Sequence, residues 1–82
     1  MPESDPQPAL GQAVRALRQK AEMSQEALAA RAELDPAAIS RIEAGQVDPA
    51  WGDVRRIARG LDVPLEALAE LAEELEGREL RP

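Results

Sequence analysis

Apolar residues recur along this chain at helical spacing, in short segments separated by prolines and helix-capping residues. In residues 9–22, Leu10, Val14 and Leu17 follow one another at intervals of four and three, which places them on one face of a helix. Further segments show the same pattern, so we expect an all-α fold. Because these helices are short, their stability must come from packing of Ala, Leu, Ile and Val faces rather than from helix propensity.

Capping residues and prolines predict where the helices begin and end. Ser24 can cap a second helix that runs to about Ala32, because its hydroxyl accepts from free amides of the first turn. Asp35-Pro36 is the clearest boundary, since aspartate caps a helix and proline suits its first position. The third helix is expected to stop at Gly45, a residue suited to the left-handed conformation after a helix end.

The second half of the chain predicts a loop and two more helices. Residues 45–52 form the loop, Asp53 caps or opens a fourth helix, and Pro64 starts a fifth. The apolar faces of the third, fourth and fifth helices are expected to comprise Ile39, Ile42, Val54, Ile57, Ala58, Leu61, Leu65, Leu68, Leu71, Ala72 and Leu75.

The 82 residues make one small domain whose formal net charge of −6 is unevenly distributed. Residues 1–8, rich in proline, are expected to be a disordered arm and carry −2. Residues 9–63 are neutral, and residues 64–82 carry −4. We expect a folded domain over 9–76 and a flexible tail over 77–82. A neutral domain can still have one positive face, but it would not bind nucleic acid by bulk charge.

The composition excludes several classes of function. Without cysteine or histidine, the chain has neither a disulfide framework nor the commonest metal ligands, and its carboxylates form no metal-binding loop. Its three serines have no histidine or lysine at a motif spacing, so we expect no enzyme, no cofactor and no metal site. Apolar runs too short for a membrane span, and an amino terminus unlike a signal peptide, predict a cytoplasmic protein without membrane contact.

The segment LRQKAEMSQEALAARAELDPAAISRIEAGQVDP, with the later VRRIARGLDVPLEAL, resembles the Xre/Cro-type, phage-repressor-like family of helix-turn-helix DNA-binding proteins. The resemblance covers residues 10–68. The motifs that carry it are Ser24-Gln25-Glu26-x-Leu28-Ala29, Ile39-Ser40-x-Ile42-Glu43-x-Gly45, Pro49 and Ile57-Ala58. Leu34-Asp35 also resembles the start of the recognition helix in controller proteins of restriction-modification systems. The resemblance implies a five-helix repressor-like helix-turn-helix domain, here with an extended C-terminal helix, whose third helix lies in the major groove.

Two positions depart from the family pattern. Glu33, in the turn between the second and third helices, and Glu22 both stand where the family usually has glycine. The resemblance implies a positive φ at Glu33, which costs a non-glycine residue on the order of 1 kcal/mol. We expect these departures to lower stability more than they affect function.

The resemblance also implies which side chains face DNA bases. Arg41 is the only long donor there and can donate to two acceptors of guanine, worth roughly 1–3 kcal/mol of discrimination. Ser40 can donate or accept, whereas Pro36 and Ala37 offer only apolar contact, for example to a thymine methyl group. The base-facing residues are Pro36, Ala37, Ser40 and Arg41. In the alternative, Arg41 is a solvated surface residue or pairs with Glu26 or Glu43.

Phosphate contacts are expected at the start of the second helix. Gln25 can hold a phosphate with its side chain and with the exposed amides around it, or it is simply a helix-start glutamine. Ser24 is expected to cap the helix first and to contact phosphate second. Weaker phosphate candidates are Arg31 and Gln46.

Other charged residues are expected to have no contact with bases. Arg18 and Glu43 occupy positions where the family makes a partly buried ion pair, so the resemblance implies a structural role for both. The arginines of the fourth helix, Arg55, Arg56 and Arg59, are expected to form a solvated face, although the first two could approach phosphates at the edge of the site.

The last helix predicts a homodimer, because its leucines extend beyond what one small core needs to cover. A domain of this size contacts few base pairs and therefore gains little sequence specificity. Two copies bound to a palindromic operator read twice as many base pairs. The residues that we divide between the core and the dimer interface are Trp51, Leu61, Val63, Leu68, Leu71 and Leu75. In the alternative, all these leucines fold back on the first helix.

These features predict a sequence-specific, dimeric transcriptional regulator that binds double-stranded operator DNA and acts as a repressor, with activation left open. Because direct donors are few, much of its specificity would come from DNA shape. The alternative is a helix-turn-helix protein-interaction module, antitoxin-like or binding a polymerase or another regulator, with weak or no direct DNA readout.

Overall fold

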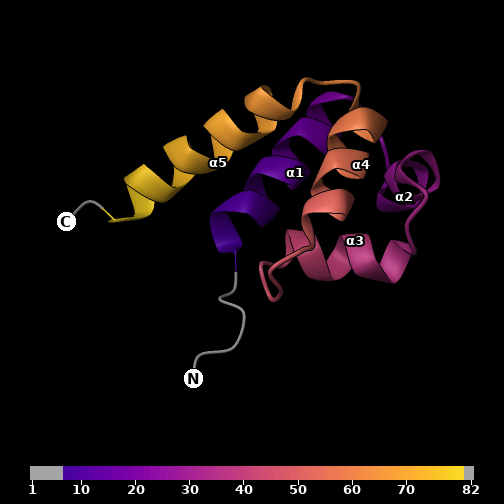
Figure 1. Cartoon of the computed structure of the whole chain (residues 1–82), viewed down its shortest axis with the longest axis horizontal. Coiled ribbons are helices and arrows are strands. Elements are labelled where there is room, and N and C mark those ends of the chain that lie inside the picture. Colours follow the sequence, from indigo (N-terminus) through magenta and orange to yellow (C-terminus); the bar gives the residue numbers. More distant parts are fainter. Residues whose placement is uncertain (1–6, 81–82) are drawn as a thin grey trace.

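The computed structural model describes residues 7–80, with side chains through Gly77, and these residues form five α-helices (Figure 1). The helices are α1 (Pro8–Lys20), α2 (Gln25–Ala32), α3 (Pro36–Glu43), α4 (Trp51–Leu61) and α5 (Leu65–Leu80). The all-α prediction is confirmed. Residues 1–6 of the expected arm and residues 81–82 of the expected tail lie outside the described part of the chain.

Two predicted caps are present where the sequence placed them. The Ser24 hydroxyl oxygen accepts a hydrogen bond from the Ala27 amide at 3.0 Å and starts α2. The Asp35 carboxylate oxygen Oδ1 accepts from the Ala37 amide at 2.9 Å and starts α3, with Pro36 at the first helical position. Each cap satisfies an amide that has no partner within its own helix.

The last two helices differ from the prediction at their ends. Helix α4 begins at Trp51 rather than near Asp53, and its capping residue Ala50 makes no side-chain hydrogen bond. Asp53 lies instead in the first turn, where a carboxylate interacts favourably with the helix dipole. Helix α5 continues through Gly77 to Leu80, past residue 76, because a helical glycine costs only about 1 kcal/mol and keeps its amide donor.

The positive φ expected at Glu33 is confirmed at 59°, and Glu22 has the same value. A third such residue, Asp62 with φ 60°, ends α4 and was not predicted. At the end of α2, the Leu34 amide donates to the Ala29 carbonyl oxygen at 2.9 Å. This backbone bond closes the helix and sets the direction in which the chain enters α3.

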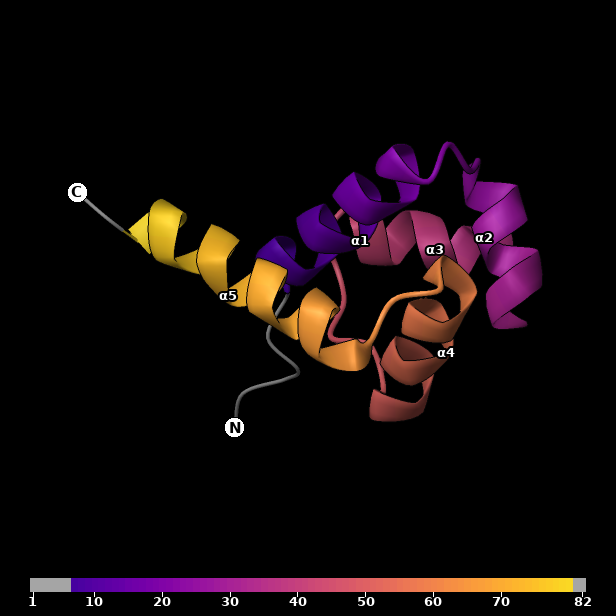
Figure 2. The ribbon, with the colours of Figure 1, turned by 90° about the horizontal axis from the view of Figure 1, so that it is seen from above.

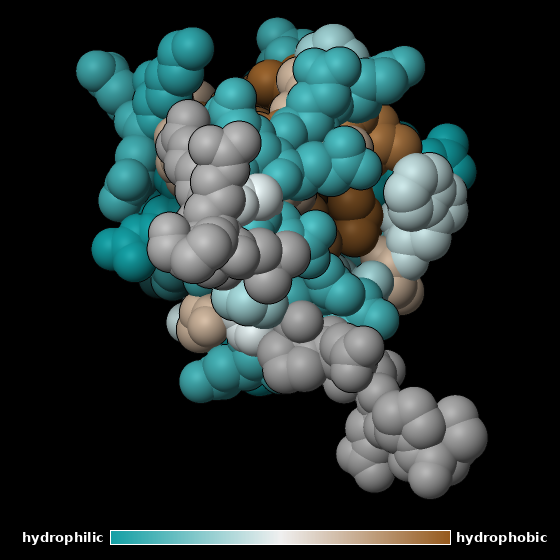
Figure 3. Space-filling view, turned by 90° about the vertical axis from the view of Figure 1, so that its left-hand side faces the viewer, coloured by the Kyte–Doolittle hydropathy of each residue, from teal (hydrophilic) through white to brown (hydrophobic). Residues whose placement is uncertain are grey.

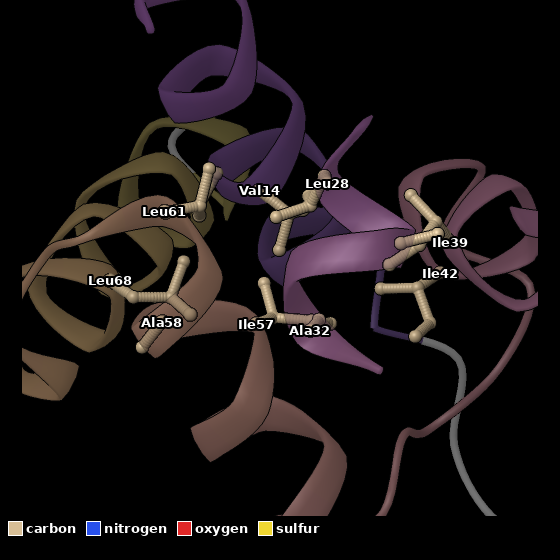
Figure 4. Close-up of a cluster of buried hydrophobic side chains, with 11 residues drawn as sticks. Val14, Leu28, Ala32, Ile39, Ile42, Ile57, Ala58, Leu61 and Leu68 are labelled. Carbon is tan, nitrogen blue, oxygen red and sulfur yellow. The ribbon is translucent and has the colours of Figure 1, made fainter. Parts of the chain in front are cut away.

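Each helix contributes one large, fully buried side chain to a single core (Figure 4): Val14, Leu28, Ile39, Ile57 and Leu68. Ile42 is 4% exposed, so the predicted burial of Ile39 and Ile42 on α3 is confirmed. Burying a side chain of this kind contributes about 1.5–3 kcal/mol. The shared core therefore holds α2 and α3 in a fixed relation to the other helices.

Glycine allows α1 and α3 to approach closely. A Cβ atom on Gly11 of α1 would overlap the carbonyl oxygen of Ile42 on α3. At the far end of α3, Gly45 has φ 74°, and a Cβ there would lie 2.7 Å from Pro8 Cα. The two contacts bring the beginning of α1 against the end of α3.

Helix α5 packs mainly against α1, and its C-terminal half extends away from the other helices (Figures 1 and 2). Within residues 7–80, no helix is long and apolar enough to span a bilayer, and no group of three acidic side chains is placed to hold a metal ion.

Candidate nucleic-acid interface

Helices α2 and α3 and the turn between them form the helix-turn-helix unit. The buried side of α3 carries Ile39, Ile42 and Glu43. The side chains of Pro36, Ala37, Ser40, Arg41 and Ala44 are all exposed. The structure therefore places the four predicted base-facing residues, with Ala44, on one solvent-accessible side of α3.

A bidentate ion pair joins α1 to α3. Arg18 Nε lies 2.6 Å from Glu43 Oε2, and Arg18 Nη2 donates to Glu43 Oε1 at 3.0 Å. The two side chains are 12% and 3% exposed, and Arg18 Nη1 donates to the Met23 carbonyl oxygen at 2.7 Å. The hydrogen bond with Glu43 raises the pKa of Arg18, although burial acts in the opposite direction. The pair has the positions and partial burial that the family resemblance implied.

The same carboxylate also holds Gln25. Gln25 Nε2 donates to Glu43 Oε1 at 3.0 Å, so one N–H of the side-chain amide has a partner. The second N–H has none among the described residues. Glu43 therefore fixes the orientation of Gln25, and it is not a partner for Arg41, which has no ion pair in the described chain.

A surface hollow of about 250 Å³ lies where α1, α2 and α3 meet, lined by Arg15, Arg18, Gln25, Ser40, Glu43 and Ala44. It brings together two predicted DNA-contacting residues, Gln25 and Ser40, with Arg15, to which sequence reasoning gave no role. A signal for Arg15 was available: it precedes Arg18 by three residues, and residues three apart are neighbours on a helix surface.

The remaining phosphate candidates do not gather at this hollow. The Ser24 hydroxyl is exposed and caps α2. Arg31 lies near the opposite end of α2, where its backbone adjoins Gly60 of α4. Gln46 is exposed in the loop that follows α3.

The predicted dimer residues divide into two groups. Leu61 is 6% exposed and Leu68 is fully buried, so of the residues that we divided between the core and the dimer interface, these two lie in the core of the subunit. Periodicity could not reveal this, because core and interface leucines occupy the same face. Val63, Leu71 and Leu75 are half-buried against the core.

Trp51 is the large hydrophobic side chain that stands exposed in the described residues, at 65%. It borders a groove of about 390 Å³ between α1, α4 and α5. The apolar lining of this groove includes Leu10, Pro49, Val54, Leu65, Ala69 and Ala72. On the face shown in Figure 3, apolar surface (brown) is exposed between hydrophilic side chains (teal).

Comparison with known proteins identifies the family. A family model described as a helix-turn-helix domain matches residues 9–71. The chain is a member of the helix-turn-helix domain family. This helix-turn-helix protein is 31% identical to the restriction-modification controller protein C.AhdI from Aeromonas hydrophila, over 74% of this chain and 92% of that one, with a TM-score of 0.73. The Xre-type resemblance and its controller-protein branch are thereby confirmed.

Two structures of a second controller protein, C.Esp1396I, are also similar. The wild-type protein is 25% identical over 93% of this chain and 99% of its own, with a TM-score of 0.82. The protein bound to a 25 base pair operator site is 26% identical over 90% and 97%, with a TM-score of 0.80. A search of curated proteins gives no match. The helix-turn-helix protein thus belongs with controller proteins and not with enzymes.

Proposed function

We propose that this protein is a transcription regulator that binds a specific DNA sequence as a homodimer and acts as a repressor. The exposed side of α3 carries this proposal, because it presents the unpaired Arg41 next to a polar hollow that contains Gln25. Support comes from the structure of C.Esp1396I on operator DNA, whose fold is shared over nine-tenths of this chain.

Base recognition is assigned to α3 in the major groove. Arg41 donates to O6 and N7 of guanine, a contact that contributes about 1–3 kcal/mol of discrimination. Pro36 and Ala37 contribute apolar contact with a thymine methyl group. Since Arg41 is the only long donor on this side of α3, sequence-dependent DNA shape supplies further specificity.

Backbone contact is assigned first to Gln25. Its side chain is anchored by the buried carboxylate of Glu43 and keeps one N–H for a phosphate oxygen. Phosphate contacts of this kind fix register and orientation without carrying sequence information.

Dimerisation is assigned to apolar side chains that the subunit core leaves partly or largely exposed, namely Trp51, Val63, Leu71 and Leu75. Trp51 is exposed beside an apolar groove, and aromatic side chains are enriched at protein interfaces. A twofold axis at an interface made by these side chains would present two copies of α3 to a palindromic operator, with half-sites about 34–36 Å apart or at a multiple of that distance. Repression follows if the dimer covers promoter DNA, and a cytoplasmic location is part of the same proposal.

A protein-interaction module is the second candidate, favoured by the scarcity of donors on α3 and by the exposed groove at Trp51. Salt dependence separates the two functions. Binding through several phosphates weakens steeply with salt, with a log–log slope of about −0.9 for each phosphate neutralised.

Selection of bound fragments from random DNA, followed by affinity measurements between low and moderate salt, tests the proposal. We expect enrichment of a palindromic sequence and a steep slope. Arg41→Ala should relax the sequence preference, whereas Gln25→Ala should weaken binding to all sequences alike. No enriched sequence, or an affinity independent of salt, would exclude the proposal in favour of the interaction module.

A further inference from the structure

The hollow between α1, α2 and α3 contains an arginine that the proposed function does not use. Arg15 is exposed, lines the hollow, and has no ion pair or hydrogen bond among the described residues. The other two charges in the lining, Arg18 and Glu43, neutralise each other at 2.6 Å. The hollow therefore has a net positive charge that comes from Arg15.

The polar groups around Arg15 suit an anion with several acceptor oxygens. Gln25 offers its second amide N–H, and Ser40 offers a hydroxyl that is exposed in the same lining. Three donors from three different helices thus converge on one concavity. Phosphate oxygens accept from arginine, amide and hydroxyl donors of this kind.

The position of the hollow distinguishes a phosphate from a base. Base edges are reached only by the helix that enters the groove, whereas the preceding helix crosses the sugar-phosphate backbone. The hollow is bounded by α1 and α2 as well as by one flank of α3. Ser40 lies on that flank, and Arg41, about 100° further around the helix, is not part of the lining.

We infer that Arg15, Gln25 and Ser40 form one binding site for a backbone phosphodiester of DNA. The inference rests on the proposed function and changes it in two respects. It adds α1 to the DNA interface, and it assigns to backbone contact Ser40, which the family resemblance placed among the base-facing residues. Glu43 acts in this site as a positioning residue, because it orients Gln25 without touching the phosphate.

The test uses the sequence enriched by selection and an unrelated duplex of equal length. Arg15→Gln should weaken binding to both duplexes by about tenfold and make the salt slope shallower by about 0.9. Ser40→Ala should weaken both duplexes by one common factor and leave their affinity ratio unchanged. The matched control is Arg59→Gln on α4, which removes the same charge from an exposed arginine outside the hollow and should keep the wild-type slope.

A scan of single methylphosphonate linkages through the enriched sequence locates the phosphate. One neutral linkage per half-site should weaken the wild type and have no further effect on Arg15→Gln. Titration with inorganic phosphate, against chloride of equal ionic strength, tests a free-anion source. If phosphate perturbs the Arg15 and Gln25 NMR signals specifically at millimolar concentration, while no methylphosphonate linkage weakens binding of the wild type, the site binds a free anion and the inference is wrong.

The two proposals fail in different ways. If the wild type binds no duplex, the proposed function and this inference fall together. If the wild type binds DNA but Arg15→Gln keeps its slope, or Ser40→Ala relaxes sequence preference as Arg41→Ala does, only this inference falls. Thermal melting by circular dichroism should match the wild type for Arg15→Gln and Ser40→Ala, because both side chains are exposed.

Discussion

Replacing Glu43 with alanine should destabilise the domain strongly. Its carboxylate, 3% exposed, accepts hydrogen bonds from Arg18 Nε, Arg18 Nη2 and Gln25 Nε2. Removing one partner of a buried ion pair costs about 3–5 kcal/mol. We expect about 3 kcal/mol, the lower end of that range, because Arg18 keeps its bond to the Met23 carbonyl and is partly open to solvent. Since the free energy of unfolding of native proteins is about 5–15 kcal/mol, this loss is a large part of the total stability.

Urea denaturation followed by far-UV circular dichroism measures this loss, provided that the dependence on urea keeps its slope. The control is Glu70→Ala on α5, an exposed glutamate that should change stability by less than about 0.5 kcal/mol. The double variant Arg18→Met/Glu43→Leu removes both charges and should recover most of the loss. A loss below about 1 kcal/mol for Glu43→Ala, or a double variant no more stable than the single one, would refute the structural role of the pair.

Three further predictions concern backbone strain, close packing and assembly. Glu33→Gly should raise the thermal midpoint, because glycine adopts the observed φ of 59° without the strain of on the order of 1 kcal/mol; calorimetry measures the shift. Gly11→Ala should lower the free energy of unfolding, measured by urea denaturation, by more than about 2 kcal/mol, because the added methyl group overlaps the Ile42 carbonyl oxygen. The control Gly52→Ala has open space around it and should stabilise α4 by about 0.5–1 kcal/mol. Trp51→Ala should weaken dimerisation in sedimentation equilibrium at least tenfold while subunit stability changes little, since the indole is exposed.

Local signals in the sequence predicted the fold well. The capping geometry of Ser24 and Asp35 depends only on neighbouring residues, so the starts of α2 and α3 were accessible without knowledge of the tertiary structure. The positive φ at Glu33 was accessible by a different route, the family resemblance, because the family usually has glycine at that position. The start of α4 was missed because Ala50 caps it without a side-chain hydrogen bond and thus leaves no pattern in the sequence.

Properties that depend on the relative placement of helices were not predictable in this way. Whether Leu68 is covered by its own subunit or by another molecule depends on how α5 crosses α1, and the spacing of leucines is identical in both cases. The role inferred for Arg15 depends on the close approach of α1 to α3 at Gly11. Sequence periodicity describes one helix at a time and does not indicate how closely two helices approach each other.

The small side chains on the exposed side of α3 make this domain a favourable starting point for engineering new operators. Ala37 faces solvent and contributes nothing to the core, so a longer side chain at this position should change stability by less than about 0.5 kcal/mol. Asparagine or glutamine introduced there can donate to and accept from adenine. The residues that the domain needs for folding are therefore distinct from the residues that can be replaced so that it binds a different DNA sequence.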